Sequence, residues 1–193
     1  MRKQISFSQY RSIDLTILAV VLVISQILIN AASTNWYVNQ PYVVSPVAAV
    51  AALVMMRWGA YVAVHAVLGG AVYVLLSGGN MQQLAIYCIG NLAAMAVLVM
   101  FRVFSKERIR ESAFLTVMFA FMVQIAMQLG RAAVAAIFGN NLSVCLGFIT
   151  TDVLSVLFTT LIIWIARRVD GLFEDQRNYL LRQEREAERR DVP

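Results

Sequence analysis

Residues 114–165, FLTVMFAFMVQIAMQLGRAAVAAIFGNNLSVCLGFITTDVLSVLFTTLIIWI, decide the fold because they contain two long apolar runs joined by a short polar turn. The runs are Phe114–Phe138 and Leu142–Ile165. Each exceeds the roughly 20 apolar residues that a helix needs to cross a bilayer core about 30 Å thick. The turn between them, Gly139–Asn141, has no charged residue. This stretch therefore predicts two transmembrane helices joined by a tight turn.

Four further apolar runs precede this pair. They are Leu15–Ala32, Val43–Met56, Ala60–Leu76 and Leu84–Phe101. The second run is short and contains Pro46, so we expect it to be tilted, kinked or only partly spanning. Hydrophobic residues make up 60% of the sequence and charged residues only 14%, which excludes a soluble globular fold. We therefore predict an all-α fold, a polytopic membrane protein with a compact bundle of six transmembrane helices.

Basic residues fall in alternate connections between these runs. They precede the first run, lie between the second and third and between the fourth and fifth, and follow the sixth: Arg2, Lys3, Arg11, Arg57, Arg102, Lys106, Arg108, Arg110, Arg167 and Arg168. The other three connections, Ser33–Tyr42, Ser77–Gln83 and Gly139–Asn141, have no charge. Because short loops rich in Lys and Arg stay in the cytoplasm, we predict both termini inside, in a multi-pass protein of a prokaryotic plasma membrane.

The net charge of +5 is explained by these flanks facing anionic lipid headgroups in the bilayer, so we expect no nucleic-acid partner. The sequence divides into a transmembrane domain, residues 1–168, and a cytoplasmic charged helical tail, residues 169–193. We expect Asp170 to cap the tail helix. Apolar residues at helical spacing give this helix one apolar edge: Leu172, Phe173, Tyr179 and Leu180. The tail helix either extends the sixth span into solvent or lies on the membrane surface or a cytoplasmic partner.

Two charged residues, Arg131 and Asp152, lie within the last two apolar runs. A charge at bilayer depth is retained only when it is paired, hydrated or used. By helix rise, Arg131 lies about two turns and Asp152 about three turns from the turn that joins these runs, on the outer side. The two side chains are therefore able to meet. One interpretation is a salt bridge that holds two helices together, and the other is part of a binding site.

Further polar side chains favour a binding site. Gln124 and Gln128 share a helix face with Arg131, at spacings of four and three residues, and a packing interface does not usually need so many donors. Asn91, about two turns into the fourth helix, adds an amide. We predict an outward-opening polar pocket among the last three helices that binds a small solute with an acceptor-rich or anionic group, to which Arg131 offers its planar guanidinium.

Catalytic motifs are missing from the sequence. It has no phosphate-binding loop of the Walker type, no nucleophile and base pair of a hydrolase, and no cluster of His or Cys residues. We therefore expect that the chain is not an enzyme, holds no metal and needs no cofactor.

The arrangement from Pro41 to Leu98, together with the tail, resembles S components, the substrate-binding subunits of energy-coupling factor transporters. The segment from Pro41 to Leu76, PYVVSPVAAVAALVMMRWGAYVAVHAVLGGAVYVLL, is similar to the central part of such subunits. There an apolar helix, a short turn of the kind seen here at RWG and a Gly-rich third helix recur. The chain length, the six spans and the cytoplasmic ends agree with such subunits across nearly the whole sequence.

The resemblance implies a subunit that binds a vitamin or other micronutrient from the outer side. It also implies partners, namely a transmembrane coupling protein and two cytoplasmic ATPases, which drive delivery of the substrate. In such subunits the substrate lies in the outer half among the later helices, under the loop between the first two spans. Here those positions correspond to the residues Asn91, Gln128, Arg131 and Asp152, with Trp36, Tyr37 and Asn39 in the covering loop.

Two alternatives remain open at this point. The first is a small membrane scaffold protein of a cell-shape or wall-synthesis complex, in which Arg131 and Asp152 are structural and the tail is the working surface. The second is a self-sufficient secondary transporter, in which Asp152 or the sole histidine, His65, carries protons. The absence of an obvious inverted repeat argues against the second.

Overall fold

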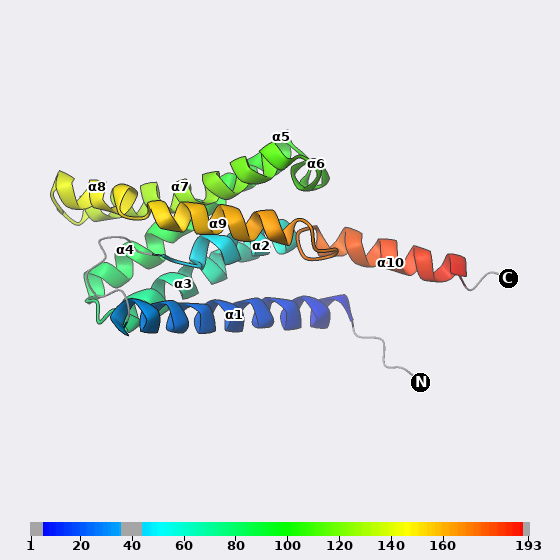
Figure 1. The fold of residues 1–193 in the computed structure, drawn as a ribbon, viewed down its shortest axis with the longest axis horizontal. Helices are drawn as coiled ribbons and strands as arrows, with labels where there is room; N and C mark the ends of the chain where they lie inside the picture. Colours follow the sequence, from blue (N-terminus) through cyan, green and yellow to red (C-terminus); the bar gives the residue numbers. More distant parts are fainter. Residues whose placement is uncertain (1–5, 36–43, 191–193) are drawn as a thin grey trace.

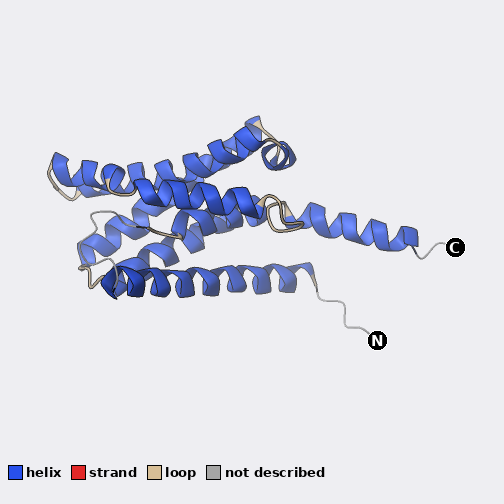
Figure 2. Cartoon of the chain, in the orientation of Figure 1, coloured by secondary structure: helices blue, strands red, loops and turns tan. Residues whose placement is uncertain are grey.

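The structure, a computed structural model, describes residues 6–35 and 44–190, and within these ranges the chain is helical without a strand (Figures 1 and 2). The α-helices are α1 (Phe7–Asn35), α2 (Val47–Trp58), α3 (Val62–Leu76), α4 (Met81–Asn91), α5 (Met100–Val103), α6 (Lys106–Glu111), α7 (Ala113–Ile137), α8 (Leu142–Thr150), α9 (Val153–Ala166) and α10 (Gln176–Arg190). Two 3₁₀ segments, η1 (Gly59–Tyr61) and η2 (Leu92–Val99), join neighbouring helices.

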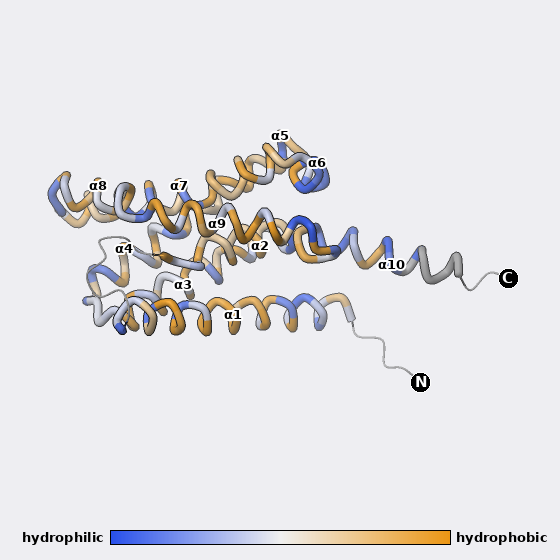
Figure 3. The backbone as a smooth tube through the Cα atoms, in the orientation of Figure 1, coloured by the Kyte–Doolittle hydropathy of each residue, from blue (hydrophilic) through white to orange (hydrophobic). Residues whose placement is uncertain are grey.

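In the described part of the chain, five helical stretches have the length and the apolar composition to cross a membrane: Phe7–Asn35, Val47–Leu76, Met81–Val103, Ala113–Ile137 and Leu142–Ala166. Hydrophobic residues dominate along these stretches, whereas hydrophilic residues gather toward α6, α10 and the opposite helix ends (Figure 3). The all-α prediction and the prediction of a multi-pass membrane protein are therefore confirmed.

The stretch Val47–Leu76 folds back on itself at Gly59. Gly59 has φ 63° and ψ −120°, a conformation that suits glycine. Val47 at the start of α2 packs against Gly69 in the middle of α3, since a Cβ on Gly69 would lie 2.6 Å from a methyl group of Val47. α2 and α3 are therefore antiparallel neighbours. With 12 residues, α2 is about 18 Å long, shorter than a bilayer core, and nearly all of its side chains are buried.

Helix α7 lies at the centre of the bundle and contacts α2, α4, α6, α8 and α9. Its closest approach is to α4, where Gly90 and Gly130 face each other. A Cβ on Gly90 would lie 2.6 Å from the Arg131 Cα, and a Cβ on Gly130 would overlap the Gly90 carbonyl oxygen. The two glycines therefore allow the backbones to touch, as small residues do between membrane helices.

We expect the variant Gly130→Ala to lower the free energy of unfolding by about 1–3 kcal/mol, because the added methyl group meets backbone that cannot rotate away. The measurement is the melting temperature of the purified chain in detergent. Gly147→Ala is the matched control, since Gly147 is also helical and a Cβ there meets nothing within 4 Å. Equal melting temperatures of Gly130→Ala and the unmodified chain would contradict the close crossing.

Two of the apolar runs are interrupted where the sequence predicted continuous helices. After Asn91 the fourth run winds as the 3₁₀ segment η2 for eight residues, longer than the usual three or four. The last run breaks between α8 and α9 at Thr151 and Asp152. Each break lies beside a tertiary contact. The segment η2 follows the contact of Gly90 with Gly130, and the α8–α9 break lies at the buried carboxylate of Asp152. These contacts outweigh the local preference for α-helix.

The tail helix begins later than predicted. Gly171, with φ 71°, turns the chain after α9, and α10 starts at Gln176. The cap is Asp175, whose Oδ1 accepts hydrogen bonds from the backbone N–H groups of Arg177 and Asn178. The expectation that Asp170 caps this helix was therefore wrong, because the turn at Gly171 intervenes. α10 then projects beyond the other helices of the bundle (Figure 1).

Candidate functional site

Arg131 is the centre of a buried polar network. It lies on α7 with 4% of its surface exposed. Its Nε donates to Asn91 Oδ1 at 2.8 Å, and its Nη1 donates to Asp152 Oδ2 at 3.1 Å. The guanidinium also stacks over the ring of Tyr87, 5.0 Å from the ring centroid. The expected meeting of Arg131 and Asp152 therefore occurs. α7 supplies Arg131, α4 supplies Asn91 and Tyr87, and the α8–α9 junction supplies Asp152.

Asp152 accepts further hydrogen bonds from two other side chains. The Gln124 Nε2 donates to Oδ2 at 2.9 Å, and the Ser155 hydroxyl donates to Oδ1. The Gln128 Nε2 donates to the backbone carbonyl of Asp152 at 3.5 Å. A buried carboxylate is stable only when its lone pairs are satisfied in this way. The break between α8 and α9 thus presents Asp152 to the polar face of α7.

The network extends from this pair to two more parts of the bundle. The Asn91 Nδ2 donates to the backbone carbonyl of Ala66 on α3 at 3.1 Å. The backbone N–H of Ser45, just before α2, donates to the Ser155 hydroxyl oxygen at 2.9 Å. The segment that leads into α2 is therefore tied to the same carboxylate as Arg131, through one serine.

A small cavity of about 30 Å³ adjoins the network. Polar groups of Arg131, Asp152 and Asn91 form part of its wall, and three aromatic rings form another part: Tyr73, Tyr87 and Phe148. The Tyr73 and Tyr87 rings lie 4.6 Å apart between centroids, and Phe148 meets Tyr87 edge-on at 5.8 Å. This volume is enough for one or two water molecules, whereas a bound organic solute needs roughly 300 Å³ or more.

The structure gathers five of the predicted site residues in one place: Asn91, Gln124, Gln128, Arg131 and Asp152. The other three, Trp36, Tyr37 and Asn39, lie outside the described residues. The aromatic wall was missed by reasoning from the sequence. Tyr87 precedes Asn91 by four residues, one helical turn, so the shared face was the signal that could have identified it.

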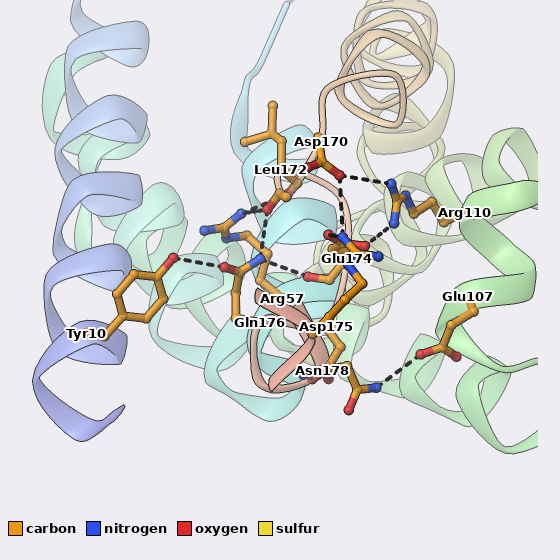
Figure 4. A network of polar contacts seen from close by, with 12 residues as sticks. Tyr10, Arg57, Glu107, Arg110, Asp170, Leu172, Glu174, Asp175, Gln176 and Asn178 are labelled. Atoms are coloured by element: carbon orange, nitrogen blue, oxygen red, sulfur yellow. Dashed lines mark hydrogen bonds and ion pairs between the residues drawn. The ribbon is translucent and has the colours of Figure 1, made fainter. Parts of the chain in front are cut away.

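A second polar network lies at the other end of the bundle, around Arg57 (Figure 4). Arg57 is 7% exposed, and its Nε and Nη2 donate to the two carboxylate oxygens of Asp14 at 2.9 and 2.6 Å. Its Nη1 donates to the backbone carbonyls of Gly171 and Leu172 at 2.6 and 3.0 Å. The indole N–H of Trp58 also donates to Asp14. One side chain thus joins α1, the α2–α3 turn and the tail.

Other contacts fix the tail segment from Asp170 to Asn178 in the same region (Figure 4). The Gln176 side chain is fully buried; it accepts from the Tyr10 hydroxyl at 3.0 Å and donates to the Gly171 carbonyl at 2.8 Å. Ion pairs connect this segment to α6: Lys106 with Asp175 and Arg110 with Glu174. Sequence reasoning used Arg57 only to orient the helices, because nothing in the sequence pairs it with Asp14, 43 residues away.

Comparison with known proteins assigns no relative. No protein-family model matches the sequence, no curated protein matches it, and no solved structure matches the fold. The functional argument therefore depends on the chemistry of the two networks and on the arrangement of the helices that carry them.

Proposed function

We propose that the chain crosses the membrane six times with both termini in the cytoplasm. The reversal at Gly59 supports two crossings, α2 and α3, within the stretch Val47–Leu76. Orientation is supported by the second network, which joins the basic connections to one another at a single end of the bundle. Arg57 and Arg110 both contact the tail there, while the uncharged turn Gly139–Asn141 follows the other end of α7. Short basic connections favour the cytoplasmic side.

We propose that the protein is the substrate-specificity subunit of an importer of the energy-coupling factor type. It binds a small vitamin or micronutrient from the outer side and delivers it through a coupling protein driven by cytoplasmic ATPases. The observation that carries this proposal is the buried pair of Arg131 and Asp152 beside an aromatic-walled cavity. The resemblance of residues 41–76 to such subunits supports the same assignment.

Energetics favour a binding role for the pair over a purely structural one. A buried ion pair contributes little to stability relative to well-packed apolar residues of similar volume. Ionisable groups inside a membrane bundle are therefore retained mainly where they bind or conduct something. Here the guanidinium offers a planar donor for a carboxylate or carbonyl group, and the rings of Tyr73 and Tyr87 offer a surface for an aromatic ligand.

The cavity defines what substrate binding requires. At about 30 Å³ it is closed to a vitamin-sized solute, so the walls separate when such a ligand enters. The mobile part of the wall is proposed to be the segment at Ser45, just before α2, which lines the cavity and whose backbone N–H donates to the Ser155 hydroxyl of the network. Helices α4 and α7 stay together, because their backbones touch at Gly90 and Gly130.

We expect one compound from a panel of vitamins and related micronutrients to raise the melting temperature of the detergent-purified chain. A ligand that binds only the folded state stabilises it by about 2.7 kcal/mol at a concentration 100 times the dissociation constant. Asn91→Ala, which removes an Arg131 partner, is expected to reduce the shift, whereas Gly147→Ala is expected to leave it unchanged. No shift across a broad panel, with a folded and monodisperse chain, would contradict the proposal.

A second candidate function, a membrane scaffold, is favoured by one observation. The tail is fixed to the bundle by buried contacts, including fully buried Phe173 and Gln176, and α10 projects outward from it (Figure 1). A scaffold would use α10 to hold a cytoplasmic partner. Deleting residues 179–193 would then abolish function in cells while Asn91→Ala is tolerated. The importer subunit predicts the reverse sensitivity at Asn91.

A further inference from the structure

A charged groove of about 690 Å³ lies between α6 and the α9–α10 connection, away from the Arg131 site. Its wall contains five basic and four acidic side chains: Lys106, Arg110, Arg167, Arg168, Arg182, Glu107, Glu111, Glu174 and Asp175. Most of these charged side chains already have a partner within the protein. Lys106 pairs with Asp175, Arg110 and Arg182 pair with Glu174, and Glu107 accepts a hydrogen bond from Asn178.

Two arginines in this wall remain uncommitted to any carboxylate in the described chain. Among the described residues, Arg167 donates from Nη2 only to the backbone carbonyl of Glu111, at 2.9 Å. Arg168 is exposed and makes no hydrogen bond or ion pair with the described residues. Both guanidinium groups instead lie over the Trp164 ring, 5.1 and 5.7 Å from its centroid. Two adjacent forked donors with free N–H groups match the oxygens of a phosphate.

The apolar surface that adjoins these arginines identifies the kind of phosphate. Leu157, Leu161 and Ile165 are 63%, 56% and 52% exposed, and with Leu154 they form one face of α9. Arg168 follows Ile165 by three residues and continues the same face. From Leu154 to Ile165 the face is about 17 Å long, close to half of a bilayer core. An acyl chain can therefore lie along α9 while its headgroup reaches the arginines.

Trp164 marks the depth of the groove in the bilayer. Tryptophan side chains gather at the membrane–water interface, with the ring at the level of the headgroups. Both guanidinium groups lie over the ring of Trp164. The preference of tryptophan for the interface therefore predicts that these groups lie at headgroup depth. A soluble phosphate would use the arginines alone, whereas a phospholipid would use the arginines, the ring and the apolar face together.

We propose that this groove, between α6 and the α9–α10 connection, is a specific site for the phosphate of a phospholipid headgroup. Arg167 and Arg168 bind the phosphate oxygens, and the acyl chain packs along Leu157, Leu161 and Ile165. The glycerol hydroxyl groups of an anionic headgroup such as phosphatidylglycerol would face Glu111, the lining carboxylate that has neither an ion pair nor a side-chain hydrogen bond within the described residues. This site lies at the opposite end of the bundle from the proposed substrate site and does not depend on it.

The test is a titration of the purified, delipidated full chain with dioleoyl phosphatidylglycerol, followed by native mass spectrometry. We expect one lipid to bind tightly, and the double variant Arg167→Gln with Arg168→Gln to weaken that binding at least about tenfold, the factor for 1.4 kcal/mol. The matched control is Arg102→Gln with Arg108→Gln, which removes two basic residues outside the groove lining. We expect this control to change the affinity less than about twofold.

Two further probes distinguish a lipid from a free anion. Inorganic phosphate at the concentration of the lipid is expected to leave the lipid bound, and dioleoylglycerol, which has no phosphate, is expected to bind more weakly. Displacement by inorganic phosphate would overturn the assignment to a lipid. Unchanged binding in the Arg167 and Arg168 variant, or an equal loss in the Arg102 and Arg108 control, would overturn the site itself. The single variant Arg168→Gln repeats the test at an exposed side chain, where we expect folding to be unaffected.

Discussion

Replacing Arg131 with methionine will lower the free energy of unfolding by about 3–5 kcal/mol, because it leaves the buried Asp152 carboxylate without its counter-charge. The carboxylate would retain the Gln124 amide and the Ser155 hydroxyl, which are neutral donors. Asn91 would also lose the guanidinium that donates to its Oδ1. The measurement is the melting temperature in detergent, together with the fraction of the chain that elutes as a monodisperse species.

The double variant Arg131→Met with Asp152→Leu separates stability from binding. Removing both charges eliminates the unpaired carboxylate, so we expect this variant to recover much of the stability lost in Arg131→Met. If the pair binds substrate, the double variant folds but shows no thermal shift with the compound that stabilises the unmodified chain. A double variant that is both stable and fully responsive to that compound would exclude the pair from the binding site.

Replacing Arg57 with methionine is expected to have an effect of similar size, about 3–5 kcal/mol, since one buried guanidinium satisfies the Asp14 carboxylate and two backbone carbonyls. The loss affects the end of the bundle where the tail is held. We therefore expect trypsin to cleave after Arg177 and Arg182 faster in the variant than in the unmodified chain, because the tail segment no longer packs on α1 and α2.

The matched control for Arg57 is Arg102→Met. Arg102 is an exposed basic residue on the same side of the proposed topology. We expect this control to alter the melting temperature little and to leave the rate of tail cleavage unchanged. Equal cleavage rates in the Arg57 variant and the unmodified chain would show that the tail is held without this network. Such a result would also remove the support that the network gives to the inward orientation of both termini.

The helices and the residues of the Arg131 site could be predicted from the sequence because helical periodicity is a local property. Gln124, Gln128 and Arg131 share one face of α7 whatever the tertiary structure, so their common direction follows from spacing alone. The meeting with Asp152 followed from the short turn between the last two apolar runs. It required only that both residues lie at a similar distance from that turn.

Features that depend on contacts between distant segments could not be predicted from local periodicity. The 3₁₀ winding of η2 follows the contact of Gly90 with Gly130, which lie 40 residues apart in the sequence. The pairing of Arg57 with Asp14 depends on how α1 packs beside the α2–α3 turn. The start of α10 was misplaced because Asp170 and Asp175 both suit a helix cap, and only the turn at Gly171 decides between them.

The eight residues of η2 also determine the length of the connection between Asn91 and the end of the bundle that holds the Arg57 network. A 3₁₀ helix rises about 2.0 Å per residue and turns about 120°, against about 1.5 Å and 100° for an α-helix. Rewinding Leu92–Val99 as α-helix would therefore shorten this connection by about 4 Å and rotate one end relative to the other by about 160°. A change of pitch in this segment would therefore displace α5 and α6 along the helix axis relative to α4, which packs against α7 at Gly90 and Gly130.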